Sequence, residues 1–271
     1  MLELALVQWA MSKASAAGYD VMLPPDVAYT RTVMGCGFSP RGEDSTDSQI
    51  YSIPDDDLCL VGTSEIAIAG FASHDLTPEA ALPVKMAAFS HCFRREAGSG
   101  GTANRGLYRL HQFSKVELFQ VVHPSASDAT LEAIVQLQRA MFLELGLHFR
   151  VLDMPTMELG ASAYRKYDIE AWMPCRQEHA DAAEAGSWGE ISSASNCTDY
   201  QARRLGIKYR PAEGGTHFAH TLNGTACAIP RIIVCLLEYG QQPDGTVRIP
   251  AALQPYLGGK AVIGKPVAEW C

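Results

Sequence analysis

Cationic, aromatic and acidic residues alternate along residues 107–122, shortly after Arg94. If this stretch is a strand, alternate side chains share one face, and that face carries Arg109, His111, Phe113, Lys115 and Glu117. A nucleotide needs cations for its phosphates and a flat surface for its base, which Arg94, Arg109 and Phe113 supply. An amino-acid substrate needs a carboxylate for its ammonium group, which Glu117 supplies. The alternative is a charged strand face at a sheet edge that meets only water.

Other common motifs are missing from the sequence. Residues 98–101 (GSGG) lack the lysine and the spacing of a Walker loop, and no Rossmann fingerprint is present. The 8 cysteines include no CxxC pair, so we expect buried reduced thiols rather than a zinc ribbon or a disulfide scaffold. On a strand, His217 and His220 would lie on opposite faces, so we expect ordinary packing rather than a metal pair.

Composition sets the general class of the protein. The 271 residues are 47% hydrophobic and 19% charged, which is typical of one large globular domain, or at most two. The longest apolar run, residues 229–237, contains Pro230 and Arg231 and is too short to span a bilayer. The net charge of −8, without a long Lys/Arg cluster, argues against broad binding of a nucleic-acid backbone by this segment alone.

Hydrophobic periodicity indicates the elements that must position the chemical groups. We expect helices at residues 2–17, 126–145 and 229–239, with Gly18 ending the first and Pro230 in the first turn of the last. We expect strands at 58–61, 84–93, 107–122 and 216–222, with a glycine-containing turn after the last one. The irregular stretches are 35–49 and 176–189. This order predicts an α+β fold, an antiparallel sheet flanked by helices.

Three runs together resemble the second signature of class II aminoacyl-tRNA synthetases in its seryl form: residues 92–98 (CFRREAG), 105–113 (RGLYRLHQF) and 115–117 (KVE). Residues 18–25 (GYDVMLPP) resemble the first signature, and residues 223–231 (NGTACAIPR) resemble the third. The seryl type is also suggested by residues 62–65 (GTSE), 190–196 (EISSASN) and 220–224 (HTLNG). The resemblance covers nearly the whole chain and implies one class II catalytic core over residues 1–271.

Within this family the chain is most similar to the animal mitochondrial type. The similarity lies in residues 152–155 (LDMP), 164–174 (YRKYDIEAWMP) and 225–231 (TACAIPR). The bacterial third signature carries glycines where this chain has Ala226 and Pro230, and the mitochondrial type shares both departures. The resemblance implies a mitochondrial location, with the cytoplasm as the alternative, and a homodimer formed through the first-signature helix.

The resemblance also implies an activity and its cofactors. L-Serine and ATP, with Mg²⁺, would give seryl-adenylate and pyrophosphate, and the seryl group would pass to the 3′ end of tRNA(Ser). Seryl enzymes carry an N-terminal helical arm that grips the tRNA, which this chain is expected to lack. Two alternatives therefore stay open: a seryl-like ligase that charges a carrier protein, and an inactive paralogue that serves as an assembly subunit.

Roles for individual residues follow from the same resemblance. Arg94 would bridge the serine carboxylate and the α-phosphate. The predicted catalytic residues are Arg94, Arg109 and Glu190. The predicted ATP-binding residues are Arg94, Glu96 (adenine amino group), Arg109 (outer phosphates), Phe113 and Arg231 (either side of adenine), and Glu190 and Ser193 (Mg²⁺). The predicted serine-binding residues are Thr63, Glu65, Arg94, Glu117, Asn223 and Thr225.

Overall fold

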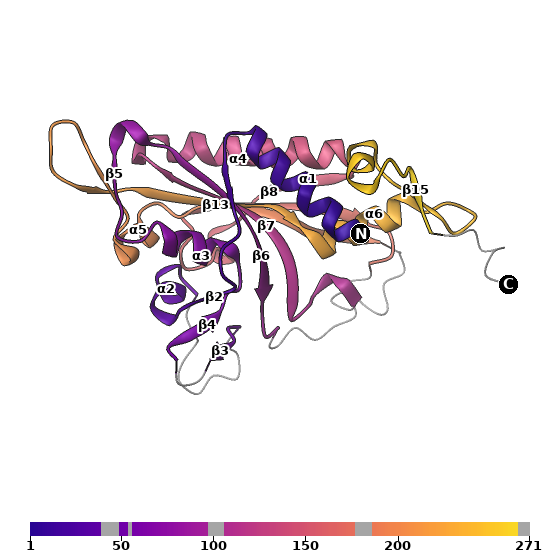
Figure 1. Cartoon of the computed structure of the whole chain (residues 1–271), viewed down its shortest axis with the longest axis horizontal. Coiled ribbons are helices and arrows are strands. Elements are labelled where there is room, and N and C mark those ends of the chain that lie inside the picture. Colours follow the sequence, from indigo (N-terminus) through magenta and orange to yellow (C-terminus); the bar gives the residue numbers. More distant parts are fainter. Residues whose placement is uncertain (39–48, 54–55, 97–105, 177–185, 265–271) are drawn as a thin grey trace.

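The computed structural model describes residues 1–38, 49–53, 56–96, 106–176 and 186–264 (Figure 1). Its helices are α1 (Leu2–Ala16), α2 (Thr30–Gly35), α3 (Ser64–Phe71), α4 (Ser127–Glu144), α5 (Tyr200–Leu205) and α6 (Ile229–Gly240). Short 3₁₀ helices are η1 (Glu79–Ala81), η3 (Gly106–Tyr108), η4 (Pro124–Ala126), η5 (Thr156–Glu158) and η6 (Ala251–Leu257). The sequence GSGG at 98–101 and most of the two irregular stretches lie outside the described residues.

A large sheet forms the centre of the fold. In the described part of the chain it is 7-stranded, in the order β1 (Asp20–Met22), β6 (Val84–Phe93), β7 (Gln112–Val122), β13 (His220–Ala228), β10 (Ser187–Asn196), β9 (Arg165–Met173) and β8 (Phe149–Asp153). All of its pairs are antiparallel except β1 with β6. The predicted α+β class, with an antiparallel sheet flanked by helices, is therefore confirmed.

Smaller sheets complete the described structure. One joins β2 (Val27–Tyr29), β4 (Leu58–Leu60) and β3 (Ser52–Ile53), and another joins β12 (His217–Phe218), β11 (Lys208–Arg210) and β5 (Leu76–Pro78). A third pairs β14 (Val247–Arg248) with β15 (Val262–Ile263). None of the described helices is both long and apolar enough to cross a membrane.

The large sheet separates two hydrophobic cores. Helices α1 and α4 cover one face, whereas α2 and α3 lie on the other (Figure 1). Strand β7 shows the division, because even positions such as Val116 and Leu118 enter the first core and odd positions such as Phe119 and Val121 enter the second. The odd positions nearer the start of β7 are polar or aromatic and leave room for a site.

The predicted helices are confirmed to within about two residues, whereas two strand predictions are wrong in part. Residues 106–108 form η3, so β7 begins at Gln112 rather than at position 107. The expected turn at Gly224 is instead the interior of β13. A Cβ at Gly224 would lie 2.6 Å from Ile134 Cγ2 on α4, so the glycine permits close helix packing rather than a turn. The strand expected at 216–222 is divided at Ala219 into β12 and β13.

Candidate active site

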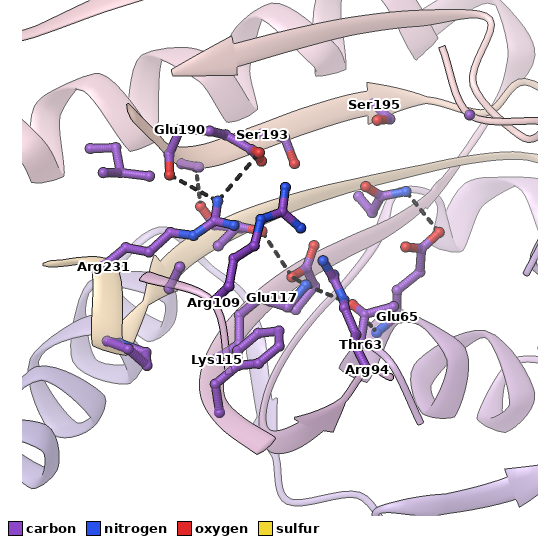
Figure 2. A pocket seen from close by; sticks show the side chains of 18 of the residues that line it. Thr63, Glu65, Arg94, Arg109, Lys115, Glu117, Glu190, Ser193, Ser195 and Arg231 are labelled. Atoms are coloured by element: carbon purple, nitrogen blue, oxygen red, sulfur yellow. Dashed lines mark hydrogen bonds and ion pairs between the residues drawn. The ribbon is translucent and has the colours of Figure 1, made fainter. Parts of the chain in front are cut away.

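All of the predicted site residues line one cavity of about 330 Å³ on the face of the sheet shared with α3 (Figure 2). Six parts of the fold contribute them. Thr63 and Glu65 begin α3, and Arg94 and Glu96 follow β6. Phe113 and Glu117 lie on β7, with Arg109 just before it. The remaining members come from β10, β13 and α6: Glu190, Ser193, Asn223, Thr225 and Arg231.

The start of α3 forms one end of the cavity. Thr63 is the N-cap residue, and its Oγ1 accepts from the backbone N–H of Glu65 at 3.3 Å. A threonine is favoured at this position because its oxygen satisfies an N–H group that has no partner within the helix. Capping therefore holds the Thr63 hydroxyl and the Glu65 carboxylate in a defined relative position.

Glu65 is a buried carboxylate held by two amide side chains. Its Oε1 accepts from Gln201 Nε2 at 2.5 Å and from Asn223 Nδ2 at 2.8 Å. Burial and the nearby Glu117 raise the pKa of Glu65 to about 7, although Gln201, Lys115 and Arg94 act in the opposite direction. Glu65 consequently changes charge near neutral pH.

Glu117 lies beside Glu65 and has its own partners. Its side chain is 3% exposed and forms an ion pair with Lys115. Thr225 Oγ1 donates to Glu117 Oε2 at 3.1 Å. Two buried carboxylates with hydroxyl neighbours can bind an ammonium group and a hydroxyl group together, which are the polar groups of a small amino acid.

Arg94 lies close enough to both ends of the cavity for its charge to act on Glu65 and on Glu190. Its Nε donates to the carbonyl oxygen of Gly62 at 3.3 Å, and its guanidinium lies 5.3 Å from the centre of the Phe113 ring. Arg94 is followed two positions later by Glu96, but the ion pair that is observed does not join these two residues. Glu96 Oε2 instead accepts from Arg109 Nη1 at 2.7 Å.

Arg231 is anchored on the opposite wall. Its Nη1 donates to the carbonyl oxygen of Glu190 at 2.8 Å and lies 3.3 Å from Glu190 Oε2. Its guanidinium also stacks on the Tyr108 ring at 4.5 Å, and the Tyr108 hydroxyl donates to the same Glu190 carbonyl at 3.1 Å. Burial raises the pKa of Glu190, but the cations led by Arg231 outweigh it, and the net pKa is below its usual value. Glu190 is therefore ionised at neutral pH.

A β-bulge on β10 decides which residues of that strand face the cavity. The pairing with β9 shifts between Glu190 and Ser192. Without the shift, Glu190 and Ser193 would lie on opposite faces, because side chains alternate along a strand. With it, both project into the cavity from the same strand, as Figure 2 shows.

The position predicted for Arg109 needs correction. It was expected on the same strand face as Phe113, but it precedes β7 and follows η3. Arg109 still lines the cavity, because the chain bends there, and its partner Glu96 is on the neighbouring segment. Alternation in the sequence therefore predicted correctly that Arg109 lies in the same site as Phe113, although the backbone at Arg109 is not a strand.

Sequence reasoning missed three residues that hold the site together. Lys115 was noted on the strand face without a role, Tyr108 supports Arg231, and Gln201 orients Glu65. The alternation along β7 was a usable signal for Lys115. Nothing local marked Gln201, which comes from α5 and meets Glu65 across 136 positions of sequence.

The two histidines and the described cysteines that were considered as metal ligands do not line the cavity. His217 packs against Tyr209 with ring centres 5.6 Å apart, and His220 Nδ1 lies 3.0 Å from Ser127 Oγ. The described cysteines are free thiols, and all but Cys175 are buried, as expected. In the described part of the chain, no three His, Cys, Asp or Glu side chains come together as a metal site would require.

Known proteins of similar sequence include serine–tRNA ligases. That of Rubrobacter xylanophilus is 47% identical over 264 residues, 97% of this chain and 59% of the relative. That of Treponema denticola is 46% identical over 95% of this chain and 58% of the relative. The chain thus spans less than two thirds of the length of these curated relatives.

Solved structures agree with these sequence matches. The seryl-tRNA synthetase of Pyrococcus horikoshii complexed with ATP has a TM-score of 0.88 and 38% identity, over 98% of this chain and 56% of that chain. The cytoplasmic serine–tRNA ligase of Naegleria fowleri in complex with AMP has a TM-score of 0.84 and 33% identity, over 97% and 59%. The family description "tRNA synthetase class II core domain (G, H, P, S and T)" matches residues 50–239. This chain belongs to the class II tRNA synthetase core family.

Proposed function

We propose that this chain is the catalytic core of a serine–tRNA ligase, which activates L-serine with ATP and transfers the seryl group to tRNA(Ser). The observation that carries the proposal is one cavity in which buried carboxylates and hydroxyl groups adjoin arginines and aromatic rings. The similarity to serine–tRNA ligases supports the same substrate class.

The amino-acid end of the cavity suits serine. Glu117 and Glu65 are acceptors for the ammonium group, and Arg94, whose charge acts on both Glu65 and Glu190, is the cation proposed for the carboxylate. Thr63, Asn223 and Thr225 surround the remaining space with polar atoms. A pocket built to bind a hydroxyl group rejects alanine, because its own polar atoms would be left without partners.

The other end suits a nucleotide triphosphate. Phe113 offers a flat surface for adenine, and Arg231 offers both a planar cation for the base and a charge for a phosphate. Glu96 lines the same cavity and would accept from the adenine amino group. Arg109, which pairs with Glu96 here, would exchange that contact for the outer phosphates.

The reaction requires placement and charge neutralisation rather than a covalent nucleophile. The serine carboxylate attacks the α-phosphorus, the bond to the bridging oxygen breaks, and pyrophosphate leaves. Arg94 contacts both the carboxylate and the α-phosphate, so its charge opposes the negative charge that accumulates during attack.

Glu190 and Ser193 fit the proposed Mg²⁺ ion by their chemistry. Glu190 is ionised, and Ser193 lies on the same strand face. Oxygen ligands of this kind suit a hard cation, which would offset phosphate charge. Arg231 already occupies one side of the Glu190 carboxylate, so it would adjust when the ion binds.

The test of this proposal is serine-dependent exchange of labelled pyrophosphate into ATP by the purified protein. Exchange with L-serine, and far less with alanine or threonine, is the expected result. An absence of exchange would contradict both ligase hypotheses and favour the inactive paralogue. Where exchange occurs, charging of tRNA(Ser) is compared with charging of a phosphopantetheine carrier protein, and the acceptor that is charged decides between them.

Serine binding should depend on pH through Glu65. Because burial raises the pKa of Glu65 to about 7, its carboxylate becomes protonated as the pH falls through that value and loses attraction for the ammonium group. KM for serine is expected to rise about tenfold between about pH 8 and about pH 6, with KM for ATP nearly constant. Glu65→Gln is the control: it should bind serine weakly, and its KM for serine should not change between about pH 8 and about pH 6. A flat profile in the wild type would contradict the assignment.

Tyr108 should affect ATP binding through Arg231. Tyr108→Ala removes the ring beneath the guanidinium, and KM for ATP is expected to rise about tenfold while KM for serine is unchanged. Tyr108→Phe keeps the ring but removes the hydroxyl contact with the Glu190 carbonyl, so its effect should be smaller. Equal effects of the two variants would show that stacking is not the important contact. Pyrophosphate exchange at a series of ATP concentrations gives KM for ATP in both Tyr108 variants.

Homodimer formation and location belong to the same proposal. A dimer through α1 and β1 is supported by large apolar side chains that this edge exposes, namely Met1, Leu4, Val21 and Leu23. Sedimentation equilibrium tests the dimer, and a monomer at micromolar concentration would contradict it.

A mitochondrial location is supported by the similarity of residues 152–155 and 164–174 to the animal mitochondrial type of the family. Imaging of the tagged full-length protein distinguishes mitochondrion from cytoplasm.

A further inference from the structure

Lys115 is a buried cation that the proposed reaction does not use. It lies on β7 between Phe113 and Glu117, and its side chain is 8% exposed. Its Nζ donates to Thr63 Oγ1 at 2.7 Å and forms an ion pair with Glu117. Burying an ammonium group costs considerable free energy unless it is paired, so both contacts matter.

The contact with Thr63 restricts what that hydroxyl can do. A threonine oxygen has two lone pairs and one proton. The backbone N–H of Glu65 donates to Thr63 Oγ1 at 3.3 Å, and Lys115 Nζ donates to the same atom. Both lone pairs are then occupied by groups that can only donate. The hydroxyl of Thr63 can therefore serve a ligand only as a donor, and the ligand atom that it meets must be an acceptor.

The contact between Lys115 and Glu117 affects the charge of the two carboxylates. Glu117 and Glu65 are neighbouring buried carboxylates, and the charge of Glu117 disfavours the ionised form of Glu65. Lys115 pairs with Glu117 directly and also favours ionised Glu65. Lys115 Nζ thus joins Thr63 of the α3 N-terminus to Glu117 of β7 at one atom, and it holds both groups at the edge of the cavity.

We propose that Lys115 is a positioning residue that holds two of the polar groups which would contact the bound amino acid. It makes Thr63 an obligate donor, and it holds Glu117 in place as the acceptor for the ammonium group. This inference rests on the proposed serine site and adds to it a residue that need not touch the substrate.

The test replaces Lys115 with methionine, which has similar length and no charge. KM for serine is expected to rise about 30-fold, the effect of losing a charged hydrogen-bonding partner, while KM for ATP stays within about twofold. Lys85→Met is the matched control: Lys85 lies on the adjacent strand β6, packs against the Tyr19 ring and is not among the residues lining the cavity. It should leave both constants unchanged.

A second variant guards against loss of folding. Lys115→Gln keeps a donor for Thr63 but not the charge, and it is expected to lie between the wild type and Lys115→Met in serine KM. Thermal unfolding of each variant shows whether it is folded at the assay temperature. The Gln variant alone suffices for the comparison if the Met variant does not fold.

Two further measurements separate positioning from a general structural effect. Thr63→Val should raise serine KM by a smaller factor in the Lys115→Met background than in the wild type, because Lys115 acts partly through Thr63. The pH at which serine affinity is lost should also move upward in Lys115→Met, since one cation that favours ionised Glu65 is gone. The charged groups that act on the pKa of Glu65 are Glu117, Lys115 and Arg94. The thiols of Cys36 and Cys197 also face Glu65, and burial raises the pKa of both, so they stay neutral where Glu65 titrates.

The outcomes distinguish this inference from the proposed function. A serine KM within about threefold of the wild type in both Lys115 variants, or an equal rise in ATP KM, would overturn the role of Lys115 and leave the ligase activity standing. Calorimetric titration with L-serine covers the opposite case. A wild type that binds serine but catalyses no exchange contradicts the proposed activity. In that case the Kd for serine of the wild type is compared with that of the Lys115 variants. A wild type that binds no serine overturns both.

Discussion

Arg94→Ala is expected to lower the rate of serine-dependent pyrophosphate exchange by about two orders of magnitude or more. The reason lies in the position of Arg94 between the two ends of the cavity. Its guanidinium is fixed by the Gly62 carbonyl and by the Phe113 ring, so it is aligned before the substrates bind. A cation held in this way opposes the developing charge without rearrangement.

The controls for Arg94 separate charge from geometry. Arg94→Lys keeps the charge but has a single ammonium group, which cannot contact the carboxylate and the phosphate as a planar fork does. It should recover only part of the lost rate. Arg139→Ala removes an exposed arginine of α4 whose observed partner is Gln136, and it should behave like the wild type. Exchange by Arg94→Ala at a near-normal rate would refute the role given to this residue.

Arg231→Ala is expected to lower kcat/KM for ATP by about 100-fold, with little change in the affinity for serine alone. Arg231 offers the nucleotide a planar cation, and it also pairs with Glu190. Its removal takes away the largest influence that lowers the pKa of Glu190. Both the stacking surface and the proposed Mg²⁺ ligand are therefore weakened together.

The pH dependence provides a specific signature for Arg231. In Arg231→Ala, burial is opposed only by Lys166 and Arg94, so the pKa of Glu190 should move upward. Activity of the variant should then fall at a higher pH than that of the wild type as the solution is made more acidic. Arg248→Ala, on the distant β14, serves as the matched control. A loss of serine affinity equal to the loss of ATP affinity would point to a general collapse of the cavity instead.

Much of the site could be predicted from sequence because its parts are local patterns. Period-two alternation placed Phe113, Lys115 and Glu117 on one face of β7, and the structure confirms that face. Resemblance to the third signature of one family identified the residues of β13 and α6, and resemblance to two further seryl-type runs, 62–65 and 190–196, identified those of α3 and β10; all of them line the same cavity. These predictions hold because they depend on short spacings within one element.

The predictions that were wrong depended on contacts between elements. Gly224 was expected in a turn because glycine is common there, but the approach of α4 to β13 is what requires it. The start of β7 was placed too early because alternation continues through η3, where backbone hydrogen bonding is no longer that of a strand. Neither packing distance nor strand pairing is encoded in the spacing of one segment.

The sequence by itself determined the class of fold, the family and the set of chemical groups in this protein. Only the tertiary structure decided how those groups face one another. A bulge on β10 brings Glu190 and Ser193 to the same side, against the alternation of their positions. Gln201 reaches Glu65 from α5, and Lys115 reaches Thr63 from β7. The physical reason is that alternation is a property of one chain segment, whereas a bulge, a buried pair and the pKa of a buried carboxylate depend on what lies across from it.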